Sequence, residues 1–125
     1  MDKGEKALQI RRTGCNCCQA VLLAFKDELG VEKEFLMRLA SGFGSGMGAM
    51  EGPCGALIGA AMTLSLLEGG KLSVRQAETK LLRDFAAKCG AVICREIKGV
   101  STGKPICSCE YCISSAAKLV EEQTE

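Results

Sequence analysis

The fold is decided by the stretch CGALIGAAMTLSLL, residues 54–67. It carries no charged residue and is apolar on nearly every face of a helix, so we predict a buried central helix over Cys54–Leu67. Pro53 fits the first turn of that helix. Gly55 and Gly59 would let another helix or a prosthetic group approach the helix backbone closely. The segment is too short to span a bilayer.

The segments on both sides of this stretch show helical periodicity with one apolar face. Asn16, Ser73 and Ser108 are good N-caps, and Gly30 and Gly90 are good C-terminal stops. One-sided helices are therefore predicted over Met1–Arg12, between Asn16 and Gly30, over Glu32–Ala40, between Ser73 and Gly90, over Val92–Lys98, and from Ser108 to Val120. No segment shows convincing strand periodicity. We predict an all-α protein, a single cysteine-rich domain over residues 1–125, folded as a compact bundle of five or six helices around the buried central helix.

The chain contains nine cysteines and no histidine. Without histidine there can be no Cys-His dyad, no Ser-His-Asp triad and no His-ligated metal. The chemistry that remains is thiol–disulfide exchange or the binding of a soft metal by thiolates. Whether the protein is an enzyme is not decided by this composition.

The charges of the chain indicate no acidic or basic partner. Sixteen Lys and Arg residues nearly balance fifteen Asp and Glu residues. They are interspersed, so we expect neither nucleic-acid binding nor membrane insertion. No N-terminal apolar run resembles a signal peptide, and we expect a cytoplasmic protein, in which thiols stay reduced unless they are redox-active or metal-bound. A redox partner protein is expected without any sign of its identity, and homo-oligomerisation is left open.

Three cysteines are predicted to lie at the starts of helices. Cys17 follows the cap Asn16, Cys54 follows Pro53, and Cys109 follows the cap Ser108. Free backbone N–H groups and the positive end of the helix dipole favour a thiolate there, so we expect a depressed pKa for a thiol in this position. Such a thiol suits metal ligation or disulfide exchange.

Other cysteines have a plainer interpretation, because free cysteine often only fills a core. Cys18 lies on the core stripe of its helix, and Cys89 lies at a helix end where the dipole disfavours a thiolate. We interpret both as packing residues. Cys109 and Cys112 form a C-x-x-C, which is moderate evidence for a zinc or redox pair, but no second C-x-x-C completes a zinc ribbon.

A glycine-rich stretch, SGFGSGMG at residues 41–48, precedes the central helix. No strand precedes it and no Lys-Ser/Thr pair follows it, so a P-loop is excluded. The favoured interpretation is a small-residue connection packed beneath a neighbouring helix. The alternative is a backbone, including Gly46 and Gly48, that closes over a cofactor.

Several segments together resemble the C_GCAxxG_C_C family of putative redox-active proteins. The segment NCCQAVL at 16–22 is similar to its N-C-A-Q-A-V-L, ASGFG and GMG at 40–48 to its A-S-G-F-G and G-M-G, CGALIG at 54–59 to its C-G-A-x-x-G, CREI at 94–97 to its C-R-E-L, and Cys109 with Ile113 and Ala116 to its last C-x3-V-x2-A element. The resemblance runs from about residue 13 to residue 120. It implies a redox role and assigns the family's four motif cysteines to Cys17, Cys54, Cys94 and Cys109. The other cysteines are additional to the family pattern: Cys15, Cys18, Cys89, Cys107 and Cys112.

Three functions are compatible with these residues. The first is an iron–sulfur cluster or similar thiolate-ligated metal centre for electron transfer, held by Cys17, Cys54, Cys94 and Cys109 and lined by small residues, namely Gly55, Ala56, Gly59, Gly46 and Gly48. The second is a metal-free thiol–disulfide exchange protein or redox sensor that uses the same thiols. The third is a structural zinc-binding interaction module. The first two require convergence, so we predict that at least three of the four sulfurs line one pocket, near the start of the central helix and under the loop over residues 42–48.

Overall fold

The computed structural model describes residues 2–125, and within this range the protein is all-α. Its helices are α1 (Lys3–Arg12), α2 (Cys17–Ala24), α3 (Lys26–Leu29), α4 (Lys33–Ala40), η1 (Gly46–Met50, a π-helical turn), α5 (Gly55–Leu66), α6 (Val74–Cys89), α7 (Cys94–Ile97) and α8 (Cys109–Thr124). Six of these helices have eight residues or more, as the predicted bundle requires. The described residues contain no strand, and one isolated antiparallel bridge joins Pro53 to Ile93.

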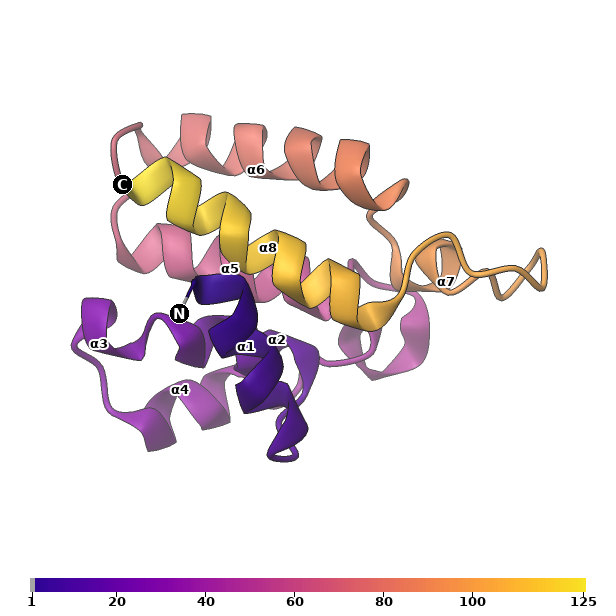
Figure 1. Cartoon of the computed structure of the whole chain (residues 1–125), viewed down its shortest axis with the longest axis horizontal. Coiled ribbons are helices and arrows are strands. Elements are labelled where there is room, and N and C mark those ends of the chain that lie inside the picture. The colour runs from indigo at the N-terminus through magenta and orange to yellow at the C-terminus, as the bar shows by residue number, and fades with distance from the viewer. Residues whose placement is uncertain (1) are drawn as a thin grey trace.

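Helix α5 lies at the centre of the bundle, as predicted. It packs against α2, α6 and α8, with α8 crossing in front of it in Figure 1. Ala56, Ala60 and Leu64 lie on α5 and are fully buried, and they join a core to which α6 and α8 contribute Phe85 and Ile113. Gly55 and Gly59 on α5 let α2 come close, because a Cβ on either glycine would meet atoms of α2.

The predicted caps are present because each depends only on local chain geometry. The Asn16 side chain accepts from the Gln19 N–H, and the Gln19 side chain accepts from the Asn16 N–H. Ser73 forms the same reciprocal box, and Ser108 caps α8 by accepting from Tyr111. Gly30 and Gly90 take left-handed conformations at the ends of α3 and α6.

The single helix predicted between Asn16 and Gly30 is wrong, because the chain breaks it at Phe25. The break frees the carbonyl of Ala24, which accepts a hydrogen bond from the Lys3 ammonium at 3.1 Å. The same ammonium lies 5.1 Å from the centre of the Phe25 ring. A residue of α1 therefore stabilises the end of α2, and this contact cannot be read from the local sequence.

Pro53 was predicted in the first turn of the central helix, and this is also wrong. Cys54 is the N-cap of α5, and the helix begins at Gly55. Pro53 instead pairs with Ile93, and the flanking amides make the bonds: Cys54 N–H donates to Val92 at 2.8 Å, and Cys94 N–H to Gly52 at 3.0 Å. Proline fits here because the bridge does not need its missing donor.

Within residues 2–125, no helix combines the length and apolar character that crossing a membrane would require.

Candidate functional site: a cavity lined by cysteines

One cavity of about 80 Å³ brings together the four cysteines that the family resemblance assigned. Cys17, Cys54, Cys94 and Cys109 all line it, and Cys112 lines it as a fifth. Gly55 at the start of α5 and Ser45 beside η1 also contribute to its wall. The predicted convergence is therefore found, whereas the roles of these thiols as ligands or redox groups remain predictions.

Each of the four cysteines lies at the start of a helix. Cys17, Cys94 and Cys109 are the first residues of α2, α7 and α8, and Cys54 is the N-cap of α5. The sequence indicated this position for three of them. It missed Cys94, because α7 has only four residues and no side chain caps it. The cavity thus lies where four helix starts meet.

The bridge between Pro53 and Ile93 brings the segment that carries Cys54 beside the segment that carries Cys94. It fixes the backbone of residues 52–54 against that of residues 92–94 through two amide bonds. Cys54 and Cys94 directly follow the paired residues, so both enter the cavity wall from adjacent segments. This pairing is the structural reason that Cys94 reaches the site.

Two of the predicted glycines leave room for cavity cysteines. A Cβ on Gly55 would lie 2.3 Å from the Cys17 Sγ and 2.6 Å from the Phe43 carbonyl oxygen. A Cβ on Gly46 would lie 2.5 Å from the Cys94 Cβ, and Gly46 itself has a φ of +59°. Gly55 lines the cavity, and Gly46 packs behind Cys94.

The other predicted cofactor-binding residues lie elsewhere. Gly59 lets α2 approach α5, because a Cβ there would lie 2.6 Å from the Cys18 carbonyl oxygen. Ala56 is fully buried in the core, where its N–H serves the thiol of Cys54. Gly48 is exposed and has no neighbour within 4 Å of its Cβ position. None of these three is among the residues that line the cavity.

Two cationic side chains lie at the cavity, Arg11 from α1 and Lys98 from the end of α7. Arg11 also donates to the Cys15 carbonyl at 3.1 Å, which holds its guanidinium beside the start of α2. Positive charge beside a set of thiols favours their ionised forms. The wall of the cavity is therefore suited to concentrated negative charge.

The pKa of Cys54 is lowered from the ordinary value of 9.0 to about 7. The largest cause is hydrogen bonding from the Cys112 thiol, followed among the lowering causes by the N–H groups of Ala56 and Leu57 and the charge of Lys98. Burial opposes these effects. The expected depression of the pKa at a helix start is present for Cys54, but the helix amides are not its main cause.

The pKa values of two other cavity thiols, Cys112 and Cys94, are raised. Hydrogen bonding with the Cys54 and Cys89 thiols, together with burial, raises the pKa of Cys112. Burial raises the pKa of Cys94, with a partly opposing effect from Lys98. The protonated Cys112 thiol beside an ionisable Cys54 is the donor–acceptor arrangement that disfavours loss of both protons.

The cavity cysteines surround a space that is wide for one metal ion. Among residues 2–125, no three of Cys17, Cys54, Cys94 and Cys109 have sulfurs that all lie within 4.8 Å of one another. A single zinc ion with bonds of about 2.3 Å needs its sulfurs closer than that on average.

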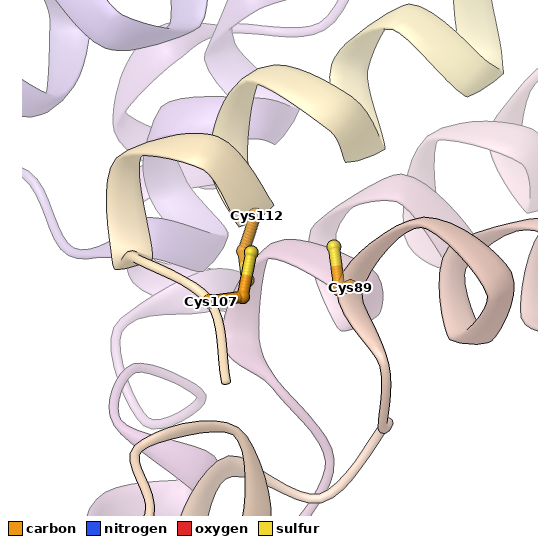
Figure 2. Close-up of side chains that lie close together, drawn as sticks. All are labelled: Cys89, Cys107 and Cys112. Carbon is orange, nitrogen blue, oxygen red and sulfur yellow. The ribbon is translucent and has the colours of Figure 1, made fainter. Parts of the chain in front are cut away.

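A second group of cysteines lies beside the cavity. The sulfurs of Cys89, Cys107 and Cys112 all lie within 4.8 Å of one another and could hold a metal ion. Figure 2 shows Cys89 at the end of α6, Cys112 on α8 and Cys107 on the segment before α8, with the three side chains converging. Cys112 belongs to both groups.

The assignment of Cys89 to packing alone is therefore incomplete. Cys89 is 1% exposed and does join the core, as expected, but it faces two other thiols. Hydrogen bonding from Cys112 lowers the pKa of Cys89, with smaller contributions from Cys107 and Ser115. Burial raises the pKa of Cys107. The spacing of Cys107 and Cys112 gave no signal for Cys89, which is distant in sequence.

The remaining two cysteines, Cys15 and Cys18, belong to a second core cluster formed by α2 and α4 with Met62 of α5 packed against it. The Sγ of Cys18 lies 3.9 Å from the Met62 Sδ, and the Sγ of Cys15 lies 3.8 Å from the Met37 Sδ. Burial raises the pKa of Cys18 to about 12, which keeps this thiol protonated and inert. The packing interpretation of Cys18 is confirmed.

Comparison with known proteins agrees with the motif cysteines found at the cavity. No curated protein and no solved structure matches the chain significantly. A family model matches residues 15–123, which covers every cysteine of the chain; its description is "Putative redox-active protein (C_GCAxxG_C_C)". The chain belongs to this C_GCAxxG_C_C family.

Proposed function

We propose that the protein is an electron carrier in which Cys17, Cys54, Cys94 and Cys109 hold an iron–sulfur cluster or a similar thiolate-ligated metal centre. The observation that carries this proposal is the meeting of four helix-start cysteines at one cavity. Thiolates are the ligands of iron–sulfur clusters. When bound, such a group supplies one-electron oxidation and reduction.

The residues around the cavity suit this role. Gly55 leaves space for the Cys17 sulfur, and Arg11 and Lys98 offset negative charge. The N–H groups of Ala56 and Leu57 point to the Cys54 sulfur. Hydrogen bonds to the sulfurs and nearby charge are the protein's means of setting a cluster's reduction potential. Cys109 is exposed, which gives the site an edge toward solvent and a redox partner.

A second function, metal-free thiol–disulfide exchange, is favoured by one specific observation. Cys54 has a pKa near 7 and lies against the thiol of Cys112. In this reaction the Cys54 thiolate attacks a substrate disulfide, one substrate thiolate leaves, and the Cys112 thiolate then displaces the second. The substrate disulfide is reduced to two thiols, and Cys54 and Cys112 are oxidised to a disulfide.

Purification of the protein without oxygen tests these functions. Iron, zinc and acid-labile sulfide are measured per chain, together with visible absorbance and free thiols. We expect iron with sulfide in the wild type. It should be lost in C17S and C94S, and retained in C15S, whose cysteine is buried like Cys94 but lies outside the cavity.

The other outcomes reject this proposal in distinct ways. Absence of metal with a reversible Cys54–Cys112 disulfide would establish the exchange function. Zinc alone, with no visible absorbance and no reversible oxidation, would establish a structural zinc module. Iron and sulfide that persist equally in C17S, C94S and C15S would place any cluster outside the cavity.

A further inference from the structure

We propose that Cys89, Cys107 and Cys112 form a second metal site, distinct from the four-cysteine cavity, that binds Cu(I) through three thiolates. Their sulfurs all lie within 4.8 Å of one another. Cys89 and Cys107 do not line the cavity, so this group has its own centre. None of the three belongs to the family's four motif cysteines.

The fold brings the three residues together through backbone features of its own. Cys89 is the last residue of α6, and Gly90 follows in a left-handed conformation with a φ of +84°. Ile106 packs on Gly90, since a Cβ there would lie 2.5 Å from the Ile106 Cγ2. The Ile106 N–H also donates to the Ile97 carbonyl at 2.8 Å. The chain is thereby anchored one residue before Cys107.

The third member comes from the first turn of α8. The Cys112 N–H donates to the Ser108 carbonyl, which fixes the turn that carries the thiol. Cys89 and Cys112 are each 1% exposed, and Cys107 is half-buried. The group is thus assembled before any ion binds (Figure 2), and half-buried Cys107 is its most exposed member.

The number of sulfurs favours a three-coordinate ion. Three metal–sulfur bonds of about 2.3 Å in one plane place the sulfurs about 4 Å apart. The three sulfurs here all lie within 4.8 Å of one another, so this geometry is within reach. Zinc in structural sites takes four ligands. Among residues 2–125, no fourth Cys, Asp or Glu side chain shares the mutual spacing of these three sulfurs; the Cys54 thiol contacts Cys112 only from the cavity side.

Softness and burial point to the same ion. Thiolates alone select soft ions such as Cu(I). A zinc site with three protein ligands keeps a water in its fourth position, whereas Cys89 and Cys112 are each only 1% exposed. Cu(I) is satisfied by three thiolates and needs no water.

The test uses the full chain, reduced and free of oxygen, and titrates Cu(I) against a coloured copper chelator. The variant C17S/C94S/C109S removes most of the cavity thiols and keeps the three proposed ligands. We expect it to bind one Cu(I) per chain, with X-ray absorption showing three sulfurs at about 2.3 Å, a thiolate–metal distance. Adding C107S or C107A should weaken binding at least about 100-fold, since even outer-sphere changes cost 10–100-fold.

The variant C15S is the control for this titration, and C107S alone serves if the triple variant does not fold. C15S, which alters a cysteine outside both groups, should bind copper as the wild type does. If the triple variant does not fold, judged by its helical circular dichroism, C107S alone should bind one Cu(I) fewer than C15S. The proposal is overturned by equal copper binding in C107S, C107A and their parents. It is also overturned if Zn(II) displaces Cu(I) from the group.

Discussion

The substitution Gly55→Ala adds one methyl group where α5 packs against Cys17, so it tests both the stability of the fold and the shape of the cavity. In Gly55→Ala the new Cβ would lie 2.3 Å from the Cys17 sulfur and 2.6 Å from the Phe43 carbonyl oxygen. The sulfur can move aside by rotation, but the carbonyl belongs to the backbone and cannot. Overpacking of this kind costs about 1–3 kcal/mol. Replacing glycine by alanine in a helix returns at most about 1 kcal/mol.

We therefore expect the free energy of unfolding of G55A to fall by about 1–2 kcal/mol. With a urea dependence of about 1–3 kcal/mol per molar, the midpoint should fall by about 1 M. Urea denaturation of the reduced protein, followed by circular dichroism, measures this change. Because Cys17 is displaced, G55A should also retain less iron and sulfide per folded chain than the wild type.

Gly42→Ala is the matched control, because the chain leaves open space at that Cβ position and its φ is ordinary for an L residue. G42A should stay within about 0.5 kcal/mol of the wild type, as surface substitutions usually do. If G55A is as stable as G42A and holds the same amount of metal, the close contact between Gly55 and Cys17 is not what shapes the cavity.

Three further outcomes are expected. In the metal-free protein, the alkylation rate of Cys54, assigned by peptide mass spectrometry, should reach half its maximum near pH 7, because the thiolate is the reactive form and the pKa of Cys54 is lowered to about 7. The variant C112A should move this midpoint to higher pH. A midpoint near pH 9 in the wild type would contradict the donor role of Cys112. In the folded protein at pH 8, Cys109 should be alkylated first because it is exposed, whereas Cys18 should stay unmodified because burial raises its pKa to about 12; equal labelling of the two would refute the burial of Cys18. Asn16→Ala should lower the free energy of unfolding by about 1–2 kcal/mol, because the cap bond to Gln19 is lost, and an unchanged urea midpoint would show that this cap does not stabilise α2.

Cys112 is shared by the two proposed metal sites. Cys112 lies in the cavity wall and in the second cysteine group. A change at Cys112 should therefore disturb both sites, whereas changes at Cys17 or Cys107 should disturb one each. This residue connects the proposed electron-carrying site with the proposed copper site.

Local sequence was sufficient for the features that depend on a few neighbouring residues. The caps at Asn16, Ser73 and Ser108 and the stop at Gly90 were predictable, since each involves bonds within one turn of the chain. The central helix was predictable from its apolar character alone, because a helix without a polar face must be covered on all sides. Placement of three cysteines at helix starts followed from these elements.

What the sequence by itself determined was thus the class of the fold, the central helix and the helix-start position of Cys17, Cys54 and Cys109. Tertiary structure alone decided the break at Phe25, where Lys3 of another helix takes the freed carbonyl, and the approach of Cys94, which the bridge between Pro53 and Ile93 holds near Cys54. It also decided the meeting of Cys89 with Cys107. The physical reason is the same in each case: these contacts join segments far apart in the chain, and periodicity and capping describe only what happens within one helix.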